Sequence, residues 1–215
     1  VEGIERIRFT SPHPADMDDS AIDAMRDCPE VSPYVHLPLQ SGSDRMLREM
    51  DRGHTVGEYL RLVDRMRRAI PDLAISTDII VGYPGETDED FEATSRIMTT
   101  VNHDHAFLFK YSRREGTRAY RVEETVSEQE KTRRLERLIA EQEDRAARIN
   151  RALVGRTTAV LVEAPARRQP DWLSGKNPQF KTVVFEPSSA RPGDIVDVRV
   201  ESASSHTLKG RQLAT

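Results

Sequence analysis

The first 126 residues alternate short apolar runs with longer stretches in which apolar and charged positions share a helical spacing. The apolar runs predict four β-strands, at Ile4 to Phe9, Tyr34 to Leu39, Leu73 to Val81 and His105 to Tyr111. The amphipathic stretches predict helices, at Asp16 to Arg26, Asp44 to Met50, Val56 to Ile70 and Phe91 to Val101. Strands that alternate with helices indicate an α/β fold with a parallel βα sheet or barrel.

The third apolar run, Leu73 to Val81, has the composition of a strand that is buried on both faces. Gly82 to Gly85 breaks this strand, and a helix is predicted to follow with Thr87 as its N-cap and Asp90 three residues later. Parallel α/β folds place their ligand sites at the carboxyl ends of such strands. A βα turn without a ligand has the same pattern, and neither a Walker loop nor GxGxxG is present.

Each of the four predicted strands ends in a polar segment marked by Gly or Pro: SPHP, QSGS, GYPGET and SRREGT. In a βα barrel these loops converge on one face, where chemistry takes place. Four strands do not close a barrel, so we expect the missing strands to precede Val1 and this sequence to be part of a longer chain.

The pattern changes after residue 126. Ser127 to Leu153 predicts a long charged helix, whose charges we expect to form a solvated face, and Gly155 ends it. From Thr157 onward, short β runs separated by turns predict a small antiparallel barrel that binds nucleic acid or docks. Residues 154–215 carry 9 Lys and Arg against 6 Asp and Glu, which hints at an anionic partner.

Composition narrows the class of protein. Charged residues make up 32% of the chain and no apolar run approaches the length of a membrane span. A single cysteine forms no internal disulfide, and no basic-then-apolar leader is visible, so a cytosolic protein is the simplest interpretation.

Several side chains are candidates for chemistry, each with a plainer alternative. His13 and His36 lie near strand ends, as in metal-dependent barrel hydrolases, but such histidines are more often hydrogen-bonded loop or core residues. Cys28 is most simply a structural thiol. Arg52 and Arg114 would clamp a carboxylate or remain solvated. Trp172, predicted in a loop near basic residues, would stack on a base or pack between domains.

Four motifs resemble, in order, the later strands of radical S-adenosylmethionine (SAM) methylthiotransferases: RIRFTSPHP, HLPLQSGSDRMLREMDRGHT, TDIIVGYPGET and FLFKYSRREGT. The charged helix and the β-rich tail resemble that family's linker and TRAM domain. The resemblance therefore covers essentially the whole chain. It implies the last four strands of a partial radical SAM barrel over 1–126, a linker helix over 127–153 and an OB-like, RNA-binding TRAM barrel over 154–215.

Within the family, SGKNPQFKTVVFE resembles the tail of the branch that methylthiolates isopentenyl-adenosine beside the tRNA anticodon. The branch that modifies a ribosomal protein is one alternative. A non-catalytic RNA-binding module, with the barrel half as a scaffold, is another.

The resemblance implies chemistry that uses SAM and two 4Fe–4S clusters. A 5′-deoxyadenosyl radical would take hydrogen from the adenine ring, and a methylated sulfur from the second cluster would bond to that carbon. The implied partners are a tRNA anticodon stem-loop and an electron donor, for a monomeric cytoplasmic enzyme without membrane association.

The resemblance also implies site residues. Those of the SAM site are Gln40, Ser41, Ser43, Arg52, Asp78, Ile80, Val81, Gly82, Tyr111 and Arg114. Arg52 would face the methionine carboxylate or the substrate, and Ile80 to Gly82 would lie along the adenine. RNA contacts are implied at Trp172, Lys176, Asn177 and Lys181.

The sequence departs from the family's pattern in its cysteines. The family's radical cluster uses a CxxxCxxC loop and its second cluster uses three further cysteines, whereas this sequence contains only Cys28, which matches neither set. We therefore expect the cluster ligands outside this sequence, no catalytic or metal-ligating residue within it, and no activity from this chain alone. Glu115 stands where the family often has proline.

Overall fold

The computed structural model describes residues 2–9 and 12–213. The chain divides into two compact units, each described by itself below. The sheet unit comprises Phe9–Pro29 and Val35–Gln142, and the barrel unit comprises Val1–Arg8, Glu30–Tyr34 and Glu143–Thr215. Within the described ranges, no helix combines the length and the apolar character needed to cross a membrane.

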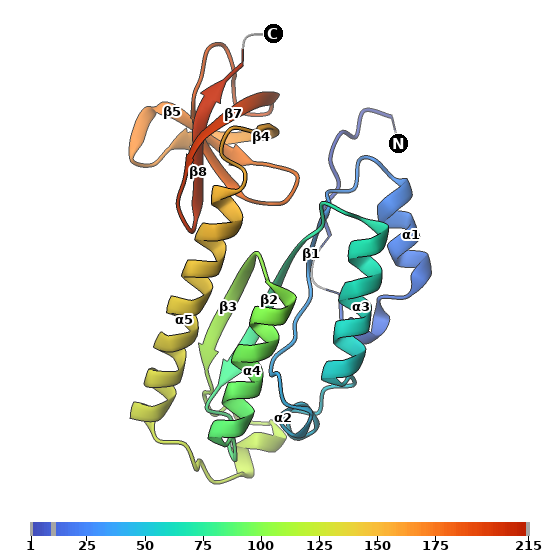
Figure 1. The fold of residues 1–215 in the computed structure, drawn as a ribbon, viewed down its shortest axis with the longest axis vertical. Coiled ribbons are helices and arrows are strands. Elements are labelled where there is room, and N and C mark those ends of the chain that lie inside the picture. Colours follow the sequence, from blue (N-terminus) through green and yellow to red (C-terminus); the bar gives the residue numbers. More distant parts are fainter. Residues whose placement is uncertain (1, 10–11, 214–215) are drawn as a thin grey trace. The chain divides into compact units, whose positions relative to one another are not determined.

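The sheet unit is built on a three-stranded sheet in the order β1-β2-β3, with β2 in the middle (Figure 1). The strands are β1 (Tyr34–His36), β2 (Ala74–Val81) and β3 (His105–Lys110). β2 and β3 are parallel, in a register that runs from Ser76 opposite His105 to Val81 opposite Lys110. A parallel bridge between Gln40 and Ile79 extends the other edge of β2 beyond β1. The carboxyl ends of the strands therefore lie at one edge, as the sequence predicts.

Helices connect these strands along the sheet. They are α1 (Asp19–Asp27), α2 (Asp44–Glu49), α3 (Val56–Ala69) and α4 (Asp88–Val101), with the 3-10 turns η1 (Pro14–Asp16) and η2 (Arg118–Arg121). The predicted capping of α4 is confirmed, because the Thr87 side chain accepts the backbone N–H of Asp90 while the Asp90 carboxylate accepts that of Thr87. The predicted single helix from Asp16 to Arg26 is instead divided into η1 and α1, since Asp18 caps a new helix start.

The core of the sheet unit lies between β2 and the apolar stripes of α3 and α4. β2 is buried along most of its length, which explains its nearly continuous apolar sequence. Tyr59 of α3 is fully buried, and its hydroxyl donates to the carbonyl oxygen of Leu37 over 2.9 Å. Its pKa rises because burial disfavours the phenolate.

The predicted first strand, Ile4 to Phe9, is wrong for the residues that the structure describes. Ile7 makes only an isolated parallel bridge to Val31, and Ile4 and Phe9 are exposed. The alternating pattern is that of a strand, but a strand forms only where a neighbour covers its apolar face. The described part of the sheet thus has three of the predicted four strands, and Thr10 and Ser11 of the predicted loop lie outside the described residues.

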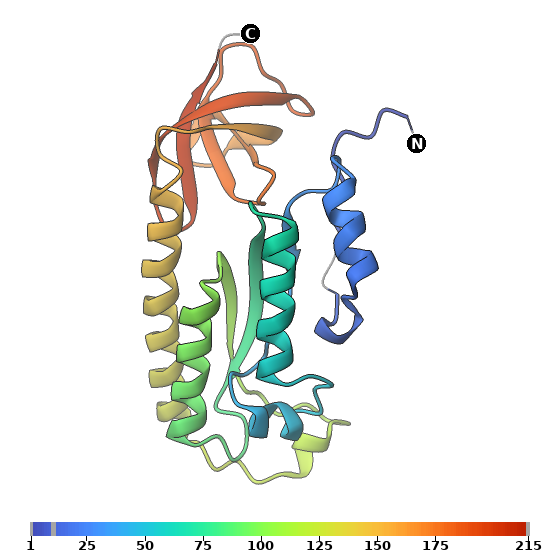
Figure 2. The ribbon, with the colours of Figure 1, turned by 45° about the vertical axis from the view of Figure 1, so that its right-hand side comes forward.

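Helix α5 (Glu128–Arg151) confirms the predicted long helix, and most of its charged side chains are exposed or half-buried, as predicted. Five of its polar side chains are buried, which a solvated face does not predict: Lys131, Arg134, Gln142, Arg145 and Asn150. Figure 2 shows the amino-terminal half of α5 running alongside α4, and Arg137 of α5 pairs there with Glu92 of α4. Burial of cations is tolerable because carboxylates from other segments pair with them.

The barrel unit contains a closed five-stranded barrel in the order β4-β5-β6-β8-β7. Its strands are β4 (Thr157–Ala166), β5 (Gln169–Lys176), β6 (Thr182–Glu186), β7 (Ile195–Ala203) and β8 (Thr207–Gln212). Alternate residues of these strands fill the interior, including Val160, Val183 and Phe185. The barrel is not wholly antiparallel as predicted, because β6 and β8 pair in parallel.

Strand β5 was not predicted, and Trp172 lies within it and not in a loop. Its sequence, QPDWLSGK, contains Pro, Asp and Gly, which are depleted in strands. Gly175 has a specific reason to be there, because a Cβ at this position would collide with the carbonyl oxygen of Leu161 on β4. A glycine thus permits the close approach of two strands.

Candidate functional site

A cavity of about 660 Å³ opens at the carboxyl ends of β2 and β3 in the sheet unit. Six of the ten residues predicted for a SAM site line it: Gln40, Arg52, Asp78, Ile80, Tyr111 and Arg114. The cavity also includes Tyr83 and Phe109, which the sequence motifs did not indicate. The volume lies within the usual range of small-molecule and cofactor pockets.

The backbone at the cavity is held in unusual conformations. Gln40 has a φ of 71° and Asp51 a φ of 55°, although neither is glycine. Gln40 is fixed there because its N–H donates to the carbonyl of Asp78 over 2.8 Å while its carbonyl accepts from Ile80 over 3.0 Å. Left-handed conformations of such residues store strain and cluster at functional sites. These two therefore add to the case for a ligand site here.

Two buried polar atoms at the cavity have no hydrogen-bond partner in the described structure: Nε of Arg52 and the hydroxyl oxygen of Tyr111. A buried donor without a partner costs free energy, which a ligand that supplies an acceptor would recover. The guanidinium of Arg52 suits a carboxylate, the kind of group that a methionine moiety carries. The donor set therefore fits the polar end of SAM.

The other lining residues supply an apolar surface. The Phe109 side chain is 50% exposed, and Ile80 lies beside it on the adjacent strand in register. The rings of Tyr83 and Tyr111 meet edge to face, with centroids 5.1 Å apart. Such a surface suits a flat heterocycle, so the residues present fit both ends of SAM.

The histidines considered as metal ligands have protein partners. Nε2 of His36 lies 3.3 Å from a carboxylate oxygen of Asp78, and its Nδ1 lies 2.8 Å from the hydroxyl of Ser76. His13 caps η1 by accepting the N–H of Ala15. Across residues 2–9 and 12–213, no group of three or more His, Cys, Asp or Glu is arranged to hold a metal ion. Cys28 is half-buried at the end of α1, where its N–H donates to the carbonyl of Ala24.

The remaining four residues of the predicted SAM site do not line the cavity: Ser41, Ser43, Val81 and Gly82. Ser41 is fully buried, with its hydroxyl oxygen 3.3 Å from that of Thr94, and Val81 is fully buried in the core. Ser43 caps α2 and donates to Asp90 over 2.6 Å. Ser41, Ser43 and Val81 support the strand ends and loops with their side chains, and Gly82 does so with its backbone N–H. Sequence motifs do not distinguish such supporting residues from ligand contacts.

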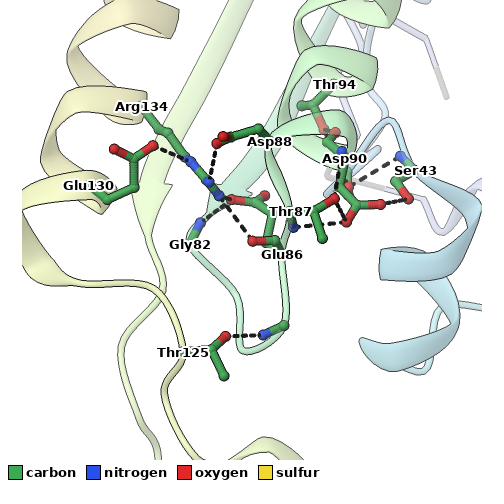
Figure 3. A network of polar contacts seen from close by, with 12 residues as sticks. Ser43, Gly82, Glu86, Thr87, Asp88, Asp90, Thr94, Thr125, Glu130 and Arg134 are labelled. Atoms are coloured by element: carbon green, nitrogen blue, oxygen red, sulfur yellow. Dashed lines mark hydrogen bonds and ion pairs between the residues drawn. The ribbon is translucent and has the colours of Figure 1, made fainter.

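Asp90 joins three segments at this edge of the sheet (Figure 3). It accepts hydrogen bonds from the hydroxyl of Ser43 and from the N–H and hydroxyl of Thr87, and it pairs with Arg45. Burial opposes ionisation of this carboxyl, but the bonds from Ser43, Arg45 and Thr87 outweigh burial and lower its pKa to about 2. The loops after β1 and β2 are thus tied together at α4.

A second buried network fixes the glycine turn after β2 (Figure 3). The Glu86 carboxylate accepts the N–H of Gly82 over 2.7 Å and a guanidinium N–H of Arg134 over 2.6 Å. Arg134 also pairs with Asp88 and Glu130, at 2.7 and 2.8 Å. Burial raises the pKa of Glu86, which the bonds from Gly82 and Arg134 only partly oppose. Burial also acts on Arg134, but its carboxylate partners raise the pKa of this guanidinium above its ordinary value.

The residues predicted to contact RNA all lie in the barrel unit. The ammonium of Lys176 donates to the hydroxyl of Thr182 over 2.8 Å and lies 4.7 Å from the ring centroid of Phe180. Burial lowers the pKa of Lys176, and the attraction of Glu163 only partly opposes this. Asn177 is almost fully buried, and its side-chain amide oxygen Oδ1 accepts the backbone N–H of Lys181. Asn177 therefore shapes the turn between β5 and β6.

Phe180 is a surface aromatic that the sequence pattern did not indicate. Its side chain is 38% exposed and its backbone has a φ of 62°. The guanidinium of Arg8 lies 4.5 Å from the ring centroid, and the ring of Tyr34 lies 5.0 Å away. An exposed aromatic with two cations beside it combines the stacking and charge features of single-stranded nucleic-acid sites.

Comparison with known proteins places these features in a family context. Residues 1–98 match the sequence model of the Radical SAM superfamily, and residues 151–213 match that of the TRAM domain. The tRNA-2-methylthio-N(6)-dimethylallyladenosine synthase of Stenotrophomonas maltophilia (strain K279a) is 44% identical over 214 residues, covering 100% of this chain and 45% of that protein. The protein of the same name from Jannaschia sp. (strain CCS1) is 46% identical over 213 residues, covering 98% of this chain and 46% of that protein. The chain thus spans less than half the length of these curated relatives.

A solved structure shares the fold. It is titled "Coproporphyrinogen III oxidase (HemN) from Escherichia coli is a Radical SAM enzyme" and aligns with a TM-score of 0.54 at 15% identity, over 79% of this chain and 46% of that chain. At this identity the match concerns the fold alone.

Proposed function

We propose that the chain is the SAM- and RNA-binding part of a tRNA methylthiotransferase, because residues 1–98 match the Radical SAM superfamily and residues 151–213 match the TRAM domain. The proposed reaction adds a methylthio group to the adenine ring of isopentenyl-adenosine beside the anticodon. The names of the curated relatives, at 44% and 46% identity, support this assignment. We also propose that the enzyme receives electrons from a separate donor, is a monomer and lies in the cytoplasm.

The observation that carries the proposal is the pair of unpartnered buried donors, Arg52 Nε and Tyr111 hydroxyl, at a cavity on the carboxyl ends of parallel strands. In the proposed complex, Arg52 binds the methionine carboxylate and Tyr111 donates to a polar atom of the same ligand. Ile80 and Phe109 lie along the adenine, with Gln40, Asp78 and Arg114 completing the polar contacts.

Bound SAM would supply the radical precursor and the methyl group. The proposed reaction also uses two 4Fe–4S clusters, whose ligands we expect outside this sequence. The chain's own residues have binding roles. Arg52 neutralises the ligand carboxylate, and the Tyr83–Tyr111 pair keeps water from the apolar side of the cavity. Gln40 and Asp51, held in strained conformations, keep the loop after β1 and the segment after α2 in place before the ligand binds.

For the RNA partner, we propose a surface formed by Lys176, Lys181, Trp172 and Phe180 of the barrel unit. Lysine ammonium groups would contact phosphates, and the exposed ring of Phe180 would stack on a base. Asn177 shapes the turn that presents Phe180, since its side chain bonds to the backbone of Lys181. We propose three segments of the chain, with boundaries after residues 126 and 153. The first half of α5, up to Gln142, nevertheless belongs to the sheet unit.

A chimeric enzyme tests the proposal. The Stenotrophomonas maltophilia relative, with its matching segment replaced by this chain, should restore the methylthio group on tRNA in cells that lack their own enzyme. Mass spectrometry of tRNA nucleosides measures the outcome, and Arg52→Met in the chimera should abolish it. A folded, cluster-loaded chimera that leaves tRNA unchanged would contradict the proposal. A mass gain on a ribosomal protein would support the alternative branch instead.

A further inference from the structure

The amino-terminal half of α5 contains two cations that are more deeply buried than a connecting helix requires. Lys131 is 1% exposed and Arg134 is 4% exposed. We propose that this half of α5 supports the ligand site from outside the cavity, and that Lys131 and Arg134 are positioning residues which hold the cavity wall. The proposal rests on the proposed function only in naming SAM as the ligand.

Arg134 holds the turn after β2 from outside. One of its terminal nitrogens binds both the Glu86 carboxylate, at 2.6 Å, and the Glu86 carbonyl, at 3.3 Å. The same carboxylate accepts the N–H of Gly82, so one ion pair determines the path of the chain from 82 to 86. Three carboxylates surround this guanidinium, which is a geometry that a lysine cannot reproduce.

Lys131 contacts the ends of two strands. A Cβ on Gly82, whose φ is 72°, would collide with Cγ of Lys131, so the aliphatic stem of the lysine fills the space that the glycine leaves. The ammonium pairs with Glu128 at 2.8 Å and with Glu124, and it lies 5.6 Å from the ring centroid of Tyr111 at the end of β3. Lys131 therefore holds the ends of β2 and β3 against one helix.

These contacts determine the wall of the cavity. Tyr83 follows Gly82 directly, lines the cavity and donates its hydroxyl to the carbonyl of Glu49 over 2.9 Å. Tyr111 lines the cavity as well, and its N–H donates to the carbonyl of Val81 over 2.8 Å. Without α5, the ligand would have to order both tyrosines as it binds, which reduces affinity.

Arg137 provides a matched control on the same helix. It pairs with Glu92 of α4 and with Glu141, and its guanidinium lies 5.2 Å from the ring centroid of Phe91. Arg134 lies at 5.5 Å from the same ring, so the two arginines share the helix and the aromatic neighbour. Their ion pairs differ, because only Arg134 binds Glu86.

The test compares Arg134→Met, Lys131→Ala and Arg137→Met in the whole chain. Amide hydrogen exchange at Gly82 and calorimetric titration with SAM are measured for each. Arg134→Met and Lys131→Ala should each raise exchange at Gly82 and the Kd for SAM about tenfold, whereas Arg137→Met should change neither. Unchanged exchange in both test variants, or faster exchange with unchanged affinity, would overturn the proposal.

Two further variants distinguish the buried ion pair from the packing of the lysine stem. If Arg134→Met does not fold, the double variant Glu86→Gln with Arg134→Met removes both buried charges, and the same two measurements apply to it. Lys131→Met keeps an aliphatic stem and should restore slow exchange at Gly82 relative to Lys131→Ala; failure to do so would count against the packing role of the stem. If the unsubstituted chain binds no SAM, the proposed function fails, while exchange at Gly82 still decides whether α5 holds the turn.

Discussion

Replacing Asp90 by asparagine should destabilise the sheet unit by about 2 to 3 kcal/mol near neutral pH. One carboxylate oxygen accepts three donors, namely the N–H and hydroxyl of Thr87 and the guanidinium of Arg45, while the other accepts Ser43. An asparagine side chain has one acceptor oxygen and turns an NH₂ group toward donors on one side. The variant therefore loses part of the capping box with Thr87, worth about 1 kcal/mol. It also loses the charge-assisted bond with Arg45, worth about 1.5 to 3 kcal/mol.

The pH dependence of this loss follows from the pKa of Asp90. The folded value is about 2, against an ordinary value of 3.8. A depressed acid pKa stabilises the fold above the unfolded pKa, and the stabilisation disappears as pH falls through the folded pKa. The shift corresponds to about 2 kcal/mol, present near neutral pH and lost between about pH 4 and about pH 2.

Urea unfolding followed by far-ultraviolet circular dichroism, repeated between about pH 7 and about pH 2, measures the difference in unfolding free energy between the two proteins. This difference in unfolding free energy should become smaller as the pH falls from about 4 to about 2, because the asparagine at position 90 has no carboxyl group to protonate. Fluorescence of Trp172, the single tryptophan, reports on the barrel unit and should be unaffected. A difference that stays constant as Asp90 titrates, or one below about 0.5 kcal/mol at neutral pH, would refute the reasoning.

Two other predictions concern the barrel unit. Gly175→Ala should destabilise the barrel by at least about 3 kcal/mol, because the new methyl group meets the carbonyl oxygen of Leu161; a native-like thermal transition of Trp172 fluorescence would show that the strands can separate at little cost. Lys176→Ala combined with Lys181→Ala should weaken binding to an anticodon stem-loop and reduce the slope of log K against log salt concentration by about 2. An unchanged slope would remove these lysines from the RNA surface.

Local sequence patterns predicted those elements whose determinants are close in the chain. The Thr87–Asp90 capping box and the apolar run of β2 are examples, and the structure has both. The segment Ile4 to Phe9 has the alternation of a strand, but a strand also needs a neighbour, which local pattern does not reveal. Strand β5 was missed for the opposite reason, because its glycine serves a contact with β4.

In the candidate site, too, the sequence predicted features determined by neighbouring residues but not contacts between distant segments. Four strand-end loops were predicted to converge, and six predicted residues from three of these motifs line one cavity, whereas no described residue of the SPHP segment lines it. The motifs did not reveal that Ser43 binds Asp90, or that the carboxylate of Glu86 reaches Arg134, 48 residues away in sequence. The sequence pattern did not single out Lys131 and Arg134 among the charges of α5, because their partners Glu124 and Glu86 lie on other segments and meet them only in the folded chain.

The central claim is that SAM binds in the cavity at the ends of β2 and β3, and calorimetric titration of the chain with SAM tests it most directly. We predict saturable binding at one site, weakened at least about tenfold by Arg52→Met and severalfold by Tyr111→Phe. Arg137→Met, which removes the pair with Glu92 of α4 and no contact with Glu86, should bind as the unsubstituted chain does. Absence of binding, or an affinity that neither Arg52→Met nor Tyr111→Phe changes, would contradict this claim.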